Sequence, residues 1–104
     1  MSSVARFEGS LRQWATSQAA VRRLWVFGSV VKGAADPSDL DIAVEIDASD
    51  PTLFWIDHGT QWQCELQALF PIKVDLVLFE PTGGSPTVAK GLSEAKWLAY
   101  ERAS

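Results

Sequence analysis

Large apolar residues occupy every second position along residues 40–46, which predicts a β-strand with one buried face. The apolar side of this strand carries Leu40, Ile42, Val44 and Ile46. We expect that side to pack against helices, because a half-buried strand turns its apolar face to the core. The other side begins with Asp39 and Asp41, and we expect it to form the floor of an open cleft. An ordinary half-exposed strand with a polar outer face is the alternative interpretation.

Three further apolar runs predict strands at 23–27, 72–79 and 96–100. One helix is predicted before the first strand, and two more are predicted between later strands. Ser10-Leu11-Arg12-Gln13 fits a capping box that begins a helix reaching about residue 18. Asp50-Pro51 fits the N-cap and first residue of a second helix reaching about residue 70, with Trp55, Gly59, Trp62, Leu66 and Leu69 at helical spacing. Ser85-Pro86 predicts the start of a third helix that ends near residue 95.

The length and the order of these elements define the expected fold class. A chain of 104 residues fits one domain, 1–104, which buries roughly 60–70% of the surface that its unfolded form exposes. Helices alternating with strands predict an α/β (α+β) fold, a small mixed β-sheet with helices on one face. Trp14, Trp25 and Trp55 fall at positions where core or helix-packing residues are expected, whereas Glu45, Asp47 and Asp50 are expected at a solvated strand end.

Asp39 and Asp41 are the first candidate site residues. Residues two apart in a strand point to the same face, so these carboxylates stand roughly 6.6 Å apart along the backbone. Two like charges held that close need a cation. Short carboxylates offer the hard oxygen ligands that suit Mg²⁺, which takes part of its shell from substrate phosphates. The pair therefore indicates nucleotide chemistry.

Gly28 and Ser29 precede this pair and supply a candidate anion site. The strand at 23–27 ends at Gly28, where the backbone must approach another group closely, and Ser29 opens a short helical turn through about Lys32. Backbone N–H groups at such a turn bind phosphate, and the serine hydroxyl adds a donor. Gly28 and Asp41 lie within 14 residues of each other, which strengthens both predictions.

Asp75 is a third candidate, because it interrupts the most apolar run of the chain. A buried aspartate costs several kcal/mol unless it is paired or bound to metal. One interpretation places Asp75 beside the aspartate pair, where it holds metal or deprotonates a nucleophile. The other places it on a solvated face, in a salt bridge with Lys73.

The chain resembles the minimal nucleotidyltransferase (MNT) family of the DNA polymerase beta-like superfamily in two segments. The first is Gly28-Ser29 followed, after nine residues, by Asp39-Leu40-Asp41-Ile42, and the second is Lys73-Val74-Asp75-Leu76-Val77. The resemblance runs from about Leu24 to Tyr100. It implies the nucleotidyltransferase fold and transfer of a nucleoside monophosphate from an NTP, by preference ATP, to a hydroxyl, with two Mg²⁺ ions and departing pyrophosphate. By matching positions, Gly28 and Ser29 would hold the triphosphate, Asp39 and Asp41 both metals, and Asp75 would be the third carboxylate.

The chain departs from this family pattern directly after Ser29. Relatives commonly carry a basic residue there, whereas this chain has Val30 and Val31, so Lys32 becomes the expected phosphate contact. Fewer positive charges then stabilise the departing pyrophosphate, which puts the catalytic strength of the site in question.

Composition and resemblance together suggest the partners. With 9 Lys+Arg against 13 Asp+Glu, the net charge of −4 opposes binding to nucleic acid. A single cysteine and no N-terminal apolar stretch indicate a reducing cytoplasm and no membrane span. Because members of the family are often encoded beside a HEPN-type toxin, the resemblance implies an antitoxin that adenylylates a protein partner. The chain carries more large apolar residues than its small core is expected to bury, and those left exposed would form an interface with a partner or a second copy of the chain. A non-catalytic protein-binding module and a stand-alone transferase acting on a small-molecule hydroxyl are the alternatives. A sugar-nucleotide transferase generally needs a longer chain.

Overall fold

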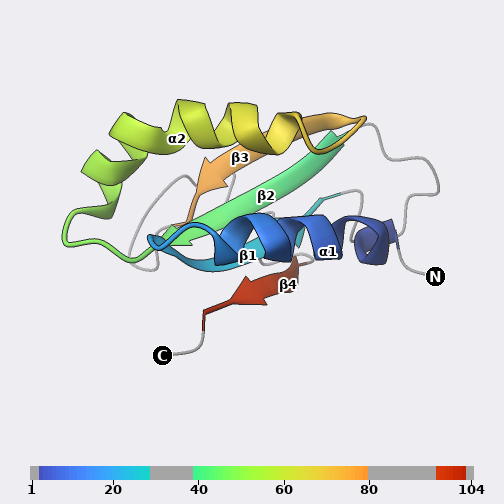
Figure 1. Cartoon of the computed structure of the whole chain (residues 1–104), viewed down its shortest axis with the longest axis horizontal. Helices are drawn as coiled ribbons and strands as arrows, with labels where there is room; N and C mark the ends of the chain where they lie inside the picture. The colour runs from blue at the N-terminus through green and yellow to red at the C-terminus, as the bar shows by residue number, and fades with distance from the viewer. Residues whose placement is uncertain (1–2, 29–38, 80–95, 103–104) are drawn as a thin grey trace.

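The computed structural model describes residues 3–28, 39–79 and 96–102, the coloured parts of Figure 1. Their elements, in chain order, are α1 (Ser3–Thr16), β1 (Val21–Phe27), β2 (Asp39–Ile46), α2 (Pro51–Gln67), β3 (Lys73–Leu78) and β4 (Lys96–Glu101). All four predicted strands are confirmed, with ends that differ from the prediction by no more than two residues. The helix predicted from Ser85 lies outside the described residues.

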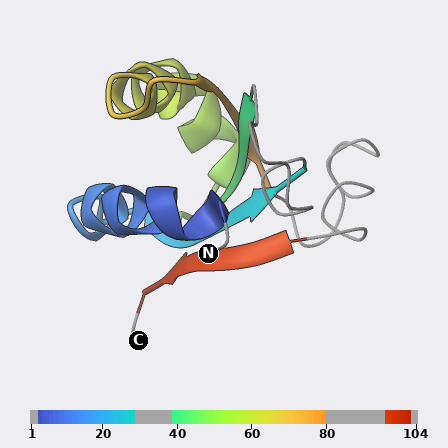
Figure 2. The ribbon, with the colours of Figure 1, turned by 90° about the vertical axis from the view of Figure 1, so that its right-hand side faces the viewer.

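The four strands form one mixed sheet in the order β3-β2-β1-β4. β1 runs antiparallel to both of its neighbours, whereas β2 and β3 are parallel. Both helices lie on the same side of this sheet (Figure 2). The predicted fold class, a small mixed sheet with helices on one face, is therefore confirmed.

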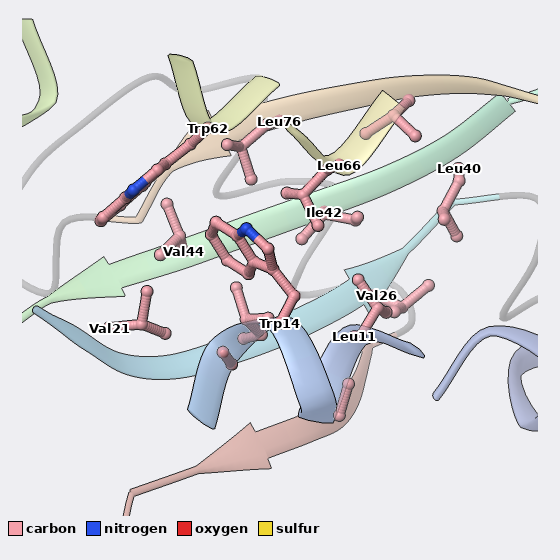
Figure 3. Packing of buried hydrophobic residues seen from close by; sticks show 14 of the residues in the cluster. Leu11, Trp14, Val21, Val26, Leu40, Ile42, Val44, Trp62, Leu66 and Leu76 are labelled. Carbon is pink, nitrogen blue, oxygen red and sulfur yellow. The ribbon is translucent and has the colours of Figure 1, made fainter. Parts of the chain in front are cut away.

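The hydrophobic core fills the space between the helices and the sheet (Figure 3). Leu40, Ile42 and Val44 are fully buried there, as the alternating pattern of β2 predicts. Each contributes roughly 1.5–3 kcal/mol through burial of its side chain. The two helices meet at Trp14 and Trp62, whose rings stack edge to face at 5.5 Å and 89°. Trp14 is thus a core residue as expected, while Trp25 and Trp55 are only partly buried.

The start of α2 is confirmed and the start of α1 is not. Asp50 caps α2, since its carboxylate accepts a hydrogen bond of 3.1 Å from the Leu53 N–H, and Pro51 occupies the first helical position. Ser10, by contrast, lies inside α1, so the capping-box prediction is wrong. The reason lies one turn earlier, where Phe7 is buried and packs edge to face on Phe70 at 5.6 Å. This contact extends the helix beyond the local capping signal.

The second face of β2 is covered over much of its length. Ala43 is fully buried, and Glu45 is only 7% exposed. The prediction of a solvated strand end is therefore wrong for Glu45, because Arg23 and Arg22 of β1 lie 2.9 Å and 3.5 Å from its carboxylate. The predicted open floor is confined to the end of the strand that carries Asp39 and Asp41, both of which are partly exposed.

Candidate active site

The three predicted aspartates meet at one end of the sheet. β2 begins at Asp39, so Asp39 and Asp41 share the face of the strand that turns away from the helices. In the parallel pairing of β2 with β3, Asp41 is aligned with Asp75 and Asp39 with Lys73. The expectation that Asp75 stands beside Asp41 on the neighbouring strand is confirmed. Lys73 joins them from the same face of β3, since it lies two residues from Asp75.

Gly28 lies directly against this group. It follows β1, whose last residue, Phe27, pairs with Asp41, and its φ is +77°. A Cβ atom at Gly28 would stand 2.3 Å from Oδ2 of Asp41, closer than any ordinary non-bonded contact. Two independent constraints thus require glycine here, and the close approach predicted from the sequence is made to the carboxylate of Asp41.

The electrostatics of the group centre on Asp41. Burial, followed by the charges of Asp75 and Asp39, raises the pKa of Asp41 above its ordinary value, and Lys73 offsets part of this rise. The aspartates therefore repel one another, and Lys73 compensates this repulsion only in part. A bound cation would relieve it.

Asp75 is less buried than its apolar surroundings suggest. Its side chain is 44% exposed, so the expected cost of burying an aspartate does not arise. The alternative predicted from the sequence, a pair with Lys73, is present at 3.9 Å, but the lysine side chain is 68% exposed. A pair this long and this exposed contributes little to stability, about 0–1 kcal/mol. It leaves Asp75 available to other ligands.

The donor chemistry of the group suits a hard divalent cation. Asp39, Asp41 and Asp75 offer only carboxylate oxygens, the ligands that Mg²⁺ takes in proteins together with water and substrate phosphates. Within residues 3–28, 39–79 and 96–102, no three acidic, histidine or cysteine side chains are already close enough together to enclose an ion. The protein alone thus supplies part of a coordination shell. Ser29 and Lys32, the predicted phosphate contacts, lie outside the described residues.

An aromatic and ionic patch borders the carboxylates on the same face of the sheet. Trp25 of β1 lies opposite Ala43 of β2 in the strand pairing, and the centroid of its ring is 4.5 Å from that of Phe79. Because Trp25 and Phe79 come from opposite sides of β2, this contact crosses the strand and covers Ala43. Beyond it, Glu45 bonds to Arg23, which also bonds to Glu101 of β4 at 2.5 Å. Arg23 of β1 thus links β2 to β4, at the end of β2 opposite to Asp39.

Lys73 is the site neighbour whose role sequence reasoning did not find. The sequence suggested it only as a partner of Asp75, whereas the structure aligns it with Asp39 and gives it an influence on Asp41. The available signal was its position two residues before Asp75, on the same side of one strand. The alignment with Asp39 depends on the order of the strands, which no local pattern specifies.

Comparisons with known proteins concern the family and the fold. The family model described as polymerase beta, nucleotidyltransferase matches residues 10–102. The fold is also similar to a chain from the solved complex of a tri-AMPylated Shewanella oneidensis HEPN toxin with an MNT antitoxin, with a TM-score of 0.62 and 19% identity over 94% of this chain and 72% of that chain. At that identity the likeness concerns the fold. No curated protein matches the chain in sequence. Neither helix in the described residues is long and apolar enough to cross a membrane.

Proposed function

The chain belongs to the polymerase beta nucleotidyltransferase family, and from that premise we propose that it transfers a nucleoside monophosphate from a nucleoside triphosphate, by preference ATP, to a hydroxyl group. The observation that carries this proposal is the alignment of Asp75 with Asp41, beside Asp39, at one end of the sheet. Three carboxylates and an incompletely compensated negative charge suit a site for metal-bound triphosphate.

We infer a division of roles among the site residues, in which Ser29 and Lys32 are assigned from the sequence alone. Asp39 and Asp41 would hold two Mg²⁺ ions, which supply charge neutralisation for the triphosphate when bound. Gly28, with Ser29 and Lys32, would contact the phosphates from the turn after β1. Asp75, half exposed, would accept the proton of the acceptor hydroxyl. The acceptor oxygen then bonds to the α-phosphorus, the bond from that phosphorus to the bridging oxygen of the β-phosphate breaks, and pyrophosphate leaves.

The acceptor we propose is a tyrosine, serine or threonine hydroxyl on a bound HEPN-type toxin, with this chain as the antitoxin. The complex of an AMPylated HEPN toxin with an MNT antitoxin, whose fold is similar, supports this choice. The net charge of −4 argues against a nucleic-acid acceptor. Exposed apolar side chains, Leu53 and Ile56 on α2 and Trp97 and Leu98 on β4, offer surface for a protein partner.

A non-catalytic module that binds the same partner is the second candidate. It is favoured by Val30 and Val31, which follow Ser29 where relatives commonly carry a basic residue, because fewer positive charges would then stabilise the departing pyrophosphate. In this case the fold and its surface would act without nucleotide chemistry. Only the transferase would add the mass of a nucleoside monophosphate to the partner protein.

Co-expression with a candidate HEPN-type toxin, followed by purification and intact-mass measurement, separates the candidates. A complex whose partner carries added nucleoside monophosphate supports the transferase, and a complex without added mass supports the binding module. Absence of any complex would point to a transferase with a small-molecule acceptor.

A variant at Asp75 tests the assigned role. We expect Asp75→Asn to retain binding of Mg·ATP in isothermal titration but to reduce transfer by roughly two to four orders of magnitude, the usual contribution of a positioned base. Asp57→Asn is the matched control, because it removes the same charge from an exposed position on α2. Full transfer activity in Asp75→Asn would contradict the assignment.

A further inference from the structure

The outer edge of β3 is covered by two glutamine side chains of α2. Gln67 accepts a hydrogen bond from the Val74 N–H and donates one to the Ile72 carbonyl, both at 2.8 Å. Gln63 repeats the arrangement one step along, accepting from the Leu76 N–H at 2.9 Å and donating to the Val74 carbonyl. Each carboxamide thus replaces the peptide group of an absent neighbouring strand. We call this pair of side chains the glutamine ladder.

The ladder depends on a match between helix and strand spacing. Four residues of a helix advance by about 6 Å, and two residues of a strand by about 6.6 Å. Glutamines four residues apart on α2 therefore meet backbone groups two residues apart on β3. The outward-facing groups of an edge strand otherwise pair readily with another chain, and the ladder occupies two positions of that edge.

The next position of the ladder is Gly59, which has no side chain to continue it. A pocket of 360 Å³ lies at this point, lined by Trp55, Ile56, Gly59, Thr60, Gln63 and Leu76. By the alternation of the strand, the Leu76 carbonyl and the Leu78 N–H face the same edge as the groups that the glutamines bind. A glutamine of this chain would not fit at Gly59 unless Trp55 moved, because a Cβ there would stand 3.0 Å from the indole ring.

We propose that this pocket takes the carboxamide of a glutamine or asparagine side chain from a bound protein, which completes the ladder. Its N–H would donate to the Leu76 carbonyl, and its oxygen would accept from the Leu78 N–H. None of the six lining residues is charged, so a carboxylate would find no cation there. β3 ends at Leu78, so a whole strand has little further edge to pair with, and a single side chain fits better.

The surface around the pocket indicates a protein as the source of the carboxamide. Ile56, at the pocket wall, is 70% exposed, and Leu53, one turn earlier on α2, is 54% exposed. A free small amide would leave these apolar side chains uncovered, whereas the residues flanking a glutamine in a protein would cover them. The pocket lies on the helix-covered face of the sheet, so the proposal does not depend on nucleotidyl transfer.

Two capped tripeptides test the proposal in solution. Acetyl-Leu-Gln-Leu-amide and acetyl-Leu-Glu-Leu-amide are titrated into the ¹⁵N-labelled protein while the backbone amide signals are followed by NMR. We expect the glutamine peptide to shift the Leu78 amide signal downfield in a saturable manner and to slow its hydrogen exchange. The glutamate peptide should do neither. Ile56→Lys should abolish the response, and Leu69→Lys, the same change at an exposed apolar residue that lies beyond the end of α2 and outside this surface, should retain it.

The remaining outcomes overturn the proposal. Equal responses to both peptides would mean that their backbones or leucines bind and that the carboxamide is not recognised. A Leu78 signal that moves with protein concentration alone would assign the edge to a second copy of this chain. No response to the glutamine peptide, in protein that a cooperative thermal melt shows to be folded, would mean that the pocket does not take a carboxamide.

Discussion

Gly28→Ala is the most informative single substitution, because two separate features of the structure oppose a side chain at this position. The φ of +77° costs a non-glycine residue about 1–2 kcal/mol. The added methyl group would also stand 2.3 Å from Oδ2 of Asp41, so the carboxylate or the backbone must move. Overpacking of this kind typically costs about 1–3 kcal/mol. We expect the free energy of unfolding to fall by about 2–5 kcal/mol, the sum of the two costs.

Urea unfolding measures this loss, and Gly9→Ala provides the matched control. Gly9 lies within α1, is exposed, and has no other group within 4 Å of the position that a methyl group would take. The same substitution there should raise stability by roughly 0.5–1 kcal/mol, since alanine favours the helix. Gly28→Ala is then repeated in an Asp41→Gly background, which removes the carboxylate. Only the cost of the positive φ, about 1–2 kcal/mol, should remain in that background.

Two results would refute this reasoning. A loss below about 1 kcal/mol for Gly28→Ala would mean that the turn tolerates a side chain despite its φ. An equal loss with and without the Asp41 carboxylate would mean that the contact between these residues does not determine the glycine.

Three further substitutions test other parts of the account. Asp41→Asn should raise stability at pH 7 by about 1 kcal/mol, since unit charges roughly 4.8 Å apart repel by about 0.9 kcal/mol in water. The pKa of Asp41 is raised in the folded protein, so the gain should be complete at a pH above this folded-state pKa. It should vanish as the pH falls to the pKa that Asp41 has in the unfolded chain. Urea unfolding at a series of pH values measures this dependence. Glu45→Ala should cost roughly 1–3 kcal/mol in the same assay, because it removes charged hydrogen bonds to Arg23. Glu8→Ala is the control, and it should cost at most about 0.5 kcal/mol because the pair of Glu8 with Arg12 is longer and more exposed. Equal losses in the two variants would contradict this prediction. Asp50→Ala should cost about 1 kcal/mol through loss of the cap, and an unchanged melting temperature would refute the capping role.

The elements that the sequence predicted well are those determined by local patterns. The alternation along 40–46 placed Asp39 and Asp41 on one face and the branched residues on the other, because a strand has a side-chain period of two. Asp50-Pro51 placed the start of α2 for a similarly local reason, the need to satisfy the first N–H groups of a helix. The close approach at Gly28 was also predicted, although the group it approaches was not.

The features that sequence reasoning missed depend on contacts between distant segments. Phe7 packs on Phe70, which extends α1 past its local capping signal. Glu45 is buried because the arginines of β1 reach it across the sheet. The alignment of Lys73 with Asp39 follows from the parallel register of β2 with β3. None of these pairings is encoded within a single element.

The central claim, that Asp39, Asp41 and Asp75 form the nucleotide site, is tested most directly by paramagnetic NMR. Mn²⁺ with ATP is added to the ¹⁵N-labelled protein, and the broadening of each backbone amide signal is measured. We predict broadening centred on the amides of Gly28, Asp41 and Asp75, with little at Gln63 on the helix-covered face, and loss of the effect in Asp39→Asn/Asp41→Asn. Broadening centred on other acidic residues, or unchanged in the double variant, would contradict the account.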